Sequence, residues 1–187
     1  MRVIAGKFKS RRLRALRGME LRPTSDRLRE TLFDILGAAV EGCMFVDLFA
    51  GTGAVGIEAI SRGARRVVFI ERHAPAVQVI RENLKSLGIT GEAEIFPMDA
   101  MRGLEKLASQ HAPSDFVFLD PPYAQAEEYR RVLEFIGAAG MLSAMGTVIA
   151  EHGKKLELPP QVEALERTRV KVQGDSALSF YRVTRMA

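Results

Sequence analysis

Residues 47–56 read DLFAGTGAVG, and this stretch decides the fold. An apolar run, Met44–Phe49, leads into it and predicts a buried strand, and a helical pattern over Ala54–Arg62 follows it. Between the two, Gly51 and Gly53 allow a tight turn and let the main chain approach a bound nucleotide where a Cβ would collide. Strand, glycine turn and helix in this order predict a site for an adenosine cofactor. A glycine turn that serves only close strand–helix packing is the alternative.

Along the chain around this stretch, apolar runs rich in β-forming residues alternate with helical patterns, which indicates a parallel sheet with helices on both faces. The predicted strands are Met44–Phe49, Arg66–Glu71, Ala93–Phe96, Asp115–Leu119 and Thr147–Glu151. The predicted helices are Ala54–Arg62, Ala74–Leu87, Ala100–Gln110 and Gln125–Ala139. After them, Val162–Gln173 and Leu178–Thr184 alternate apolar and polar residues around Gly174-Asp175, which predicts an antiparallel hairpin. The expected fold is an α/β, Rossmann-like, mostly parallel sheet of seven strands with a C-terminal antiparallel hairpin.

The length and composition of the chain are typical of a globular protein. The 187 residues are 47% apolar and 27% charged, and no apolar stretch approaches the ~20 residues of a membrane span. The single cysteine, Cys43, excludes an internal disulfide, and no Cys/His cluster has zinc spacing. We expect a cytoplasmic protein without a metal, and we predict that Cys43 is a buried apolar residue. His73, His111 and His152 are expected to be surface or packing residues.

The basic charge gathers at one end. Residues 1–30 hold ten Lys or Arg against three acids, whereas the rest of the chain holds seventeen against twenty. We therefore divide the chain into a basic extension, 1–42, and a main domain, 43–187. In the extension, Arg2–Ala5 and Arg12–Leu16 could pair as a small hairpin, and Asp26–Leu36 is a predicted helix capped by Thr24-Ser25. This charge balance indicates an arm that binds nucleic acid, and a solvated tail without a partner is the alternative. The candidate RNA-binding residues are Lys7, Lys9, Arg11, Arg12, Arg14, Arg22, Arg27 and Arg29.

Two acidic residues bear on which cofactor the loop binds. The spacing Gly51-x-Gly53-x-x-Gly56 also fits a dinucleotide fingerprint, and Glu71 lies 20 residues beyond Gly51, where a ribose-binding acid is expected. Asp47, however, precedes the glycines, and its carboxylate would repel a pyrophosphate but attract an ammonium group. The methionine moiety of S-adenosylmethionine carries such an ammonium. The pattern therefore favours S-adenosylmethionine over NAD.

The fourth predicted strand runs into Asp120-Pro121-Pro122-Tyr123. Two prolines cannot continue a β-ladder, so the strand must end here, at the edge where open α/β sheets bind ligands. Asp120 and the Pro121 carbonyl offer acceptors for an exocyclic amine, and Tyr123 offers a flat surface for stacking on a base. A structural strand terminator is the other interpretation.

These motifs together resemble the class I S-adenosylmethionine-dependent amino-methyltransferases. The N-terminal segment LRPTSDRLRETLF, residues 21–33, and GIEAISRGA, residues 56–64, narrow the resemblance to the RsmD family of 16S rRNA guanine-N2 methyltransferases. The likeness covers residues 2–123 closely. It implies that Asp47, Phe49, Gly51 and Gly53 line the methionine end of the cofactor, that Glu71 holds the ribose and Asp99 the adenine amine, and that Asp120, Pro121 and Tyr123 hold the target guanine.

The resemblance implies methyl transfer to N2 of the guanine at position 966 of 16S rRNA, free or in an assembled or assembling small subunit. We expect a monomer that does not bind membranes. Transfer to N6 of an adenine in DNA or RNA is the alternative reaction. An NAD-dependent reductase would explain the glycine loop but not the Asp-Pro-Pro-Tyr turn. A non-catalytic RNA-binding module would explain the basic extension but neither motif.

Overall fold

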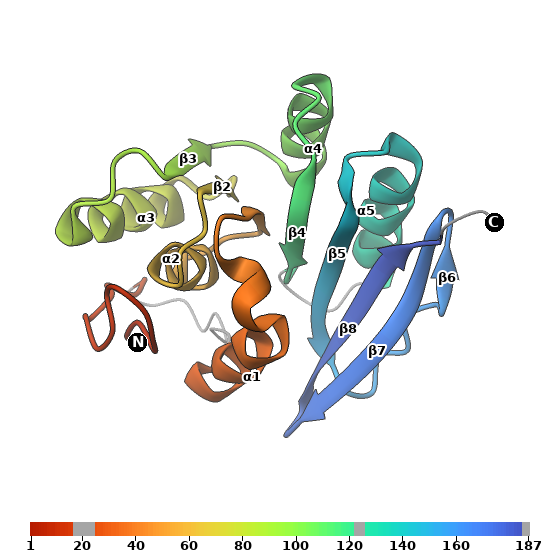
Figure 1. Cartoon of the computed structure of the whole chain (residues 1–187), viewed down its shortest axis with the longest axis horizontal. Coiled ribbons are helices and arrows are strands. Elements are labelled where there is room, and N and C mark those ends of the chain that lie inside the picture. Colours follow the sequence, from red (N-terminus) through yellow and green to blue (C-terminus); the bar gives the residue numbers. More distant parts are fainter. Residues whose placement is uncertain (17–24, 122–125, 185–187) are drawn as a thin grey trace.

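A computed structural model describes residues 1–16, 25–121 and 126–184. These residues form one sheet of eight strands in the order β3-β2-β1-β4-β5-β8-β7-β6 (Figure 1). β1 to β5 pair in parallel, and β8, β7 and β6 continue the sheet antiparallel. The strands are β1 Met44–Leu48, β2 Arg66–Ile70, β3 Ala93–Phe96, β4 Ser114–Leu119, β5 Leu142–Gly153, β6 Gln161–Val162, β7 Leu165–Gln173 and β8 Ser176–Val183.

The Rossmann-like α/β fold is confirmed, with two differences in the sheet. The expected seven strands are eight, because the two-residue β6 adds to the end of β7. β5 begins five residues earlier than predicted, because a bulge in its pairing with β4 accommodates Ala144, Met145 and Gly146. A Cβ on Gly146 would lie 2.9 Å from the Ser114 carbonyl oxygen, so this close approach of the two strands requires glycine.

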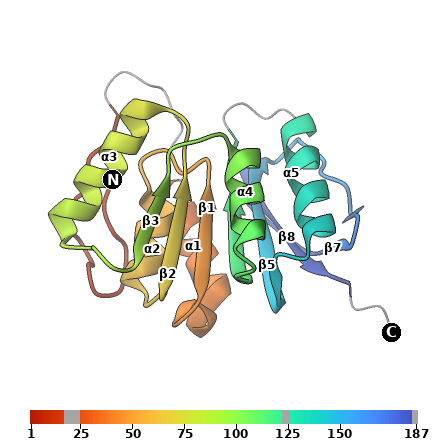
Figure 2. The ribbon, with the colours of Figure 1, turned by 90° about the horizontal axis from the view of Figure 1, so that it is seen from above.

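Helices cover both faces of the sheet (Figure 2). They are α1 Asp26–Leu36, followed by the short 3₁₀ helix η1 Gly37–Val40, then α2 Ala54–Ser61, α3 Ala74–Leu87, α4 Ala100–Ser109 and α5 Ala126–Ala139. α1, α2 and α3 share one hydrophobic core with Phe45 and Phe69, and α4 and α5 share the other with Val46 and Val68. Successive strand residues thus serve opposite cores, as the two-residue period of a strand requires.

Local capping sets the ends of the helices. The Ser25 hydroxyl accepts a hydrogen bond from the Leu28 amide at 3.1 Å, which begins α1 as the sequence predicts. Gly88, with φ +70°, ends α3 in the left-handed conformation. Among the described residues, no helix is both long and apolar enough to cross a membrane.

Residues 1–16 lie against α2 and α3 instead of extending into solvent. The expected hairpin is reduced to one antiparallel bridge, between Arg2 and Arg12. The buried Glu58 of α2 accepts hydrogen bonds from the Ile4 and Ala5 amides at 2.7 and 2.9 Å. A Cβ on Gly6 would overlap the Ser61 carbonyl oxygen. The segment is therefore held by specific main-chain contacts.

Candidate active site

The strand register brings the ends of three strands to one edge. Leu48 of β1 pairs with Ile70 of β2 on one side and with Leu119 of β4 on the other. From β1 the chain passes to β2 and β3, and it then returns to β4 on the other side of β1. This reversal is a topological switch point, where open α/β sheets bind ligands beyond the carboxyl ends of their strands.

The glycine loop at this edge has three residues in the left-handed region. Phe49, Gly51 and Gly53 have φ values of +60°, +54° and +76°. For Phe49 this conformation costs about 1–3 kcal/mol, a strain typical of ligand-binding loops. A Cβ on Gly53 would press on Ile80 at 3.2 Å, whereas a Cβ on Gly51 would meet no protein atom closer than 3.9 Å. Gly53 thus serves packing as well as the turn, and Gly51 faces open space.

Two carboxylates hold this loop in place. Asp47 Oδ2 accepts a hydrogen bond from the Gly56 amide at 2.8 Å. Glu71 Oε2 accepts one from the Gly51 amide, also at 2.8 Å, and its Oε1 accepts one from the His73 amide. The two predicted cofactor-binding acids therefore also fix the loop they flank, which the sequence pattern did not indicate.

The Asp47 carboxyl lies in a position suited to a cation. Its side chain is buried, and burial raises its pKa from 3.8 to about 8. The negative charge of Glu71 also raises this pKa, whereas the hydrogen bond from Gly56 lowers it. No Lys, Arg or His of the described residues forms an ion pair with it. An ammonium group at this point would neutralise a buried carboxylate, so the residues present fit an amino-acid moiety.

Asp99 lies one strand further, at the start of α4. Its side chain accepts a hydrogen bond from the Met101 amide at 3.0 Å and lies 3.9 Å from the Arg72 guanidinium. It is the N-cap of α4, so its structural role is clear. Its predicted contact with an adenine amine stays a prediction.

On the other side of β1, Asp120 and Pro121 follow β4 directly. Asp120 is half-buried and Pro121 is buried, while Tyr123 lies outside the described residues. Behind them, the Tyr129 hydroxyl of α5 donates to the Glu151 carbonyl oxygen. Burial raises the Tyr129 pKa, and the charges of Asp120 and Glu151 raise it further. Tyr129 thus supports this side of the site, and the sequence offered no signal for it beyond an apolar helix face.

The candidate RNA-binding residues occupy different environments. Arg14 forms an ion pair with Glu82 at 2.6 Å, and Arg11 donates to the Ser86 carbonyl oxygen at 3.0 Å. The Lys7 ammonium lies 5.2 Å from the centre of the Phe8 ring. Arg22 lies outside the described residues. Lys9, Arg12 and Arg27 are exposed.

The prediction that Arg29 contacts RNA is wrong, because its side chain is fully buried. It donates to the Arg2 carbonyl oxygen at 2.6 Å and to Asp26 at 3.0 Å, and its Nε lies 3.9 Å from Glu58. The sequence placed Arg29 off the buried face of α1. Residues 1–16 and α2 close over that position, which makes it an internal ion-pair site.

Of the remaining residues, Cys43 and His152 lie within the packing, whereas His73 and His111 are exposed. Cys43 is buried, as predicted, and burial raises its pKa to about 12. His152 is buried with Nε2 at 2.9 Å from the Ser179 hydroxyl and Nδ1 at 3.0 Å from the Gly153 carbonyl oxygen. Burial lowers its pKa, so it is neutral near pH 7. No cluster of three potential metal ligands occurs in the described part of the chain.

The strand order, the glycine loop and the two carboxylates that hold it define a Rossmann-like class I methyltransferase fold. The family model "Conserved hypothetical protein 95" matches residues 1–182. Ribosomal RNA small subunit methyltransferase D of Escherichia coli K12 is 34% identical over 184 residues, covering 97% of this chain and 89% of the relative. The chain belongs to this family, the RsmD family.

Further comparisons extend over nearly the whole chain. YlbH of Bacillus subtilis strain 168 is 38% identical over 182 residues, covering 97% of this chain and 98% of its own. The solved structure of Escherichia coli yhhF superimposes with a TM-score of 0.85 at 29% identity, covering 100% of this chain and 99% of the other. The fold therefore includes the N-terminal segment and the C-terminal hairpin as parts shared with relatives.

Proposed function

We propose that this protein is an rRNA methyltransferase that transfers a methyl group from S-adenosylmethionine to the exocyclic N2 of a guanine in 16S rRNA. The observation that carries the proposal is that the candidate cofactor site and the candidate acceptor site lie side by side at the switch point of the sheet. A loop held by Asp47 and Glu71 ends β1, and the Asp120-Pro121 turn ends the neighbouring β4. The name of the Escherichia coli relative supports rRNA as the substrate class. The resemblance to the RsmD family supports the guanine at position 966.

S-adenosylmethionine supplies a methyl group on a sulfonium, which is already reactive toward a nucleophile. Asp47 would hold the cofactor's ammonium, and Phe49, Gly51 and Gly53 would line its methionine end. Glu71 accepts from the ribose hydroxyls, since a carboxylate has lone pairs beyond those used by the Gly51 and His73 amides. Asp99 lies at the end of β3, on the side proposed for the adenine.

On the acceptor side, Asp120 and the Pro121 carbonyl oxygen accept hydrogen bonds from the two N–H groups of the guanine amine, and Tyr123 stacks on the base. The lone pair of this amine is delocalised into the ring, which makes the nitrogen a poor nucleophile. Hydrogen-bond acceptors lower the barrier because they favour a pyramidal nitrogen and stabilise the positive charge that develops on it. Holding the amine in line with the methyl group contributes most, on the order of 7–11 kcal/mol. After transfer, the methylated nitrogen loses its extra proton to water, so no histidine is required as a base.

Product analysis tests this proposal. Unmodified 16S rRNA, both protein-free and in small subunits, is incubated with the protein and methyl-labelled S-adenosylmethionine, and the digested nucleosides are identified by mass spectrometry. We expect N2-methylguanosine at one position. N6-methyladenosine would instead support the alternative reaction, and absence of any methylated nucleoside with either substrate would contradict the proposal.

A further inference from the structure

The outermost long strand of the sheet has one open edge. β7 pairs with β8 along its length, but its other side pairs with β6 only at Leu165 and Glu166. The residues from 168 to 173 therefore form an unpaired edge in the described structure, on the hairpin at the right of Figure 1. Such edges normally attract other chains unless charged side chains guard them.

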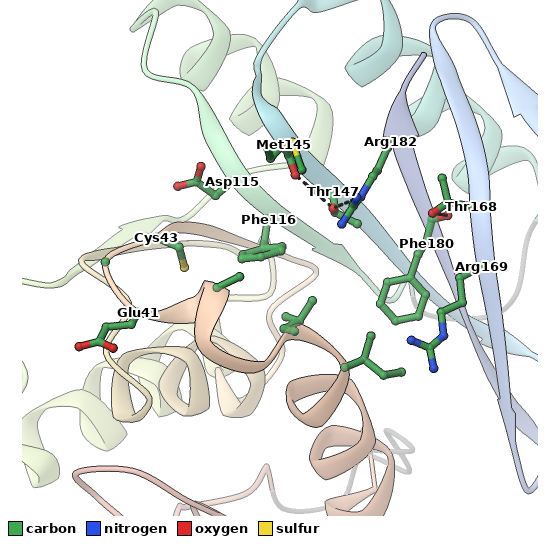
Figure 3. Close-up of a pocket in the computed structure, with 14 residues that line it drawn as sticks. Glu41, Cys43, Asp115, Phe116, Met145, Thr147, Thr168, Arg169, Phe180 and Arg182 are labelled. Atoms are coloured by element: carbon green, nitrogen blue, oxygen red, sulfur yellow. Dashed lines mark hydrogen bonds between the residues drawn. The ribbon is translucent and has the colours of Figure 1, made fainter. Parts of the chain in front are cut away.

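Two cations on this edge face the side of α1. Arg169 pairs with Phe180 and Lys171 pairs with Leu178, and cross-strand partners share one face of a sheet. Phe180 and Leu178 belong to the core that α1, α2 and α3 cover. Arg169 and Lys171 therefore extend toward α1, and Figure 3 shows the Arg169 guanidinium on this side of the hairpin.

Between α1 and the hairpin lie two hollows of about 460 and 490 Å³. Arg169 lines the first, beside Phe180 and Ile35. Lys171 and Arg27 line the second, together with the α1 acids Glu30 and Asp34. The two hollows follow the length of α1.

The cations of these hollows have no acidic partner in the described part of the chain. Arg27, Arg169 and Lys171 are exposed and form no ion pair, not even with Glu30 or Asp34. Arg14 of the N-terminal segment, in contrast, is neutralised by Glu82. Arg27, Arg169 and Lys171 are thus not held by an ion pair, although Glu30 and Asp34 line the same hollow as Arg27 and Lys171.

The hairpin also lies on the edge of the sheet that carries the candidate active site. Gly153, the last residue of β5, pairs with Ser176, and Ser176 pairs with Gln173 of β7. The turn between β7 and β8 therefore lies at the carboxyl edge, beyond β5, while residues 1–16 lie against α2 and α3 on the other side. The Asp120 turn lies between these two basic regions.

We propose that Arg27, Arg169 and Lys171, which we call the ribbon surface, bind the sugar–phosphate backbone of the substrate RNA. This inference rests on the proposed function and adds a second RNA contact, opposite the N-terminal segment. Lysine and arginine on a strand edge oppose the addition of another protein strand, whereas each of them strengthens phosphate binding. Two contacts on either side of the site would hold the RNA while the target base is turned out of its stack.

The test measures RNA binding and methyl transfer by the full chain. Wild type is compared with the double variant Arg169→Ala/Lys171→Ala, with the charge-preserving exchange Arg169→Lys/Lys171→Arg, and with Arg65→Ala, which removes an exposed cation at the start of β2. Affinity for protein-free 16S rRNA and for small subunits is measured between about 50 and 200 mM salt at constant pH. Cofactor affinity and the thermal unfolding midpoint show whether each variant is folded.

We expect the double variant to lower the log–log salt slope by about 1.4–1.8, since each phosphate contact contributes about 0.7–0.9. Its KM for rRNA should rise while kcat at saturating RNA and cofactor affinity stay unchanged, and the exchange variant should retain binding. An unchanged slope in a folded double variant would overturn the inference. If the double variant loses affinity for small subunits but not for protein-free rRNA, the ribbon surface binds a ribosomal protein, and the inference is again overturned. Failure of wild type to methylate rRNA would instead contradict the proposed function.

Discussion

At the scale of single residues, Asp47, which we propose binds the cofactor, shows how a buried carboxyl opposes stability. Its carboxyl is buried without a cation among the described residues, and burial raises its pKa to about 8. The folded state therefore binds a proton at pH values where the unfolded chain, with a pKa of 3.8 for this group, has released it. Stability consequently falls as pH rises from about 4 to about 8. Under the proposed function, a cofactor ammonium paired with the carboxylate would remove this penalty.

Asp47→Asn keeps the acceptor for the Gly56 amide but cannot ionise. We expect the free energy of unfolding of the variant, relative to wild type, to increase between pH 5 and pH 8, and cofactor affinity at pH 8 to fall by tenfold or more, since a hydrogen bond to a charged group contributes about 1.5–3 kcal/mol. Urea unfolding at several pH values and calorimetric titration measure both. A stability difference that does not change with pH would show that Asp47 is already ionised in the folded protein.

Under the proposed function, Asp120 contacts the acceptor amine and should affect the reaction alone. Asp120→Ala removes an acceptor for the target amine, an interaction that strengthens in the transition state, so we expect turnover to fall by about 10²–10³. Cofactor affinity should stay within a few-fold of wild type. Single-turnover rates and calorimetry separate the two effects. If affinity for the cofactor collapses while the single-turnover rate survives, Asp120 serves the cofactor.

At the scale of elements, a buried ion-pair cluster joins α1, α2 and the N-terminal segment. Glu58 accepts from the Ile4 and Ala5 amides and pairs with Arg62 at 2.8 Å, and Arg29 lies beside it. Arg29 in turn holds the Arg2 carbonyl oxygen. The cluster thus adds polar contacts between three segments that also share one hydrophobic core.

Arg29→Ala leaves Glu58 buried with less positive charge beside it. We expect a loss of about 3–5 kcal/mol in the free energy of unfolding, the cost of breaking a buried pair. Arg27→Ala, on the exposed side of the same helix, should change stability by less than about 0.5 kcal/mol. Urea unfolding measures both variants, and equal stabilities would contradict the role assigned to Arg29.

At the scale of the whole molecule, the basic extension and the sheet share one core. Val3, Phe8 and Leu13 pack in the same hydrophobic cluster as Phe33 of α1 and Phe45 of β1. A fragment of residues 43–187 would expose this apolar surface and leave Glu58 without its main-chain donors. We expect this fragment to lose cooperative thermal unfolding and cofactor binding. A fragment that unfolds cooperatively and binds the cofactor would instead support residues 1–42 as a separate domain.

The sequence by itself determined the features that depend on neighbours along the chain. The glycine loop, the helix caps at Ser25 and Gly88 and the turn after Leu119 follow from backbone chemistry within a few residues, so their positions could be predicted. Asp47 and Glu71 could be proposed as cofactor-binding acids from the sequence because their spacing from the glycines is itself local. The order of elements then indicated the class of fold.

Only the tertiary structure decided the features that depend on contacts between distant segments. Arg29 became buried because residues 1–16 and α2 close over it, and no helical periodicity reports such a cover. β6 forms because it lies beside β7, and Arg169 and Lys171 face α1 because of the register of β7 with β8. Burial and register are set by the free energy of the whole packed chain. A single stretch of sequence therefore leaves them open.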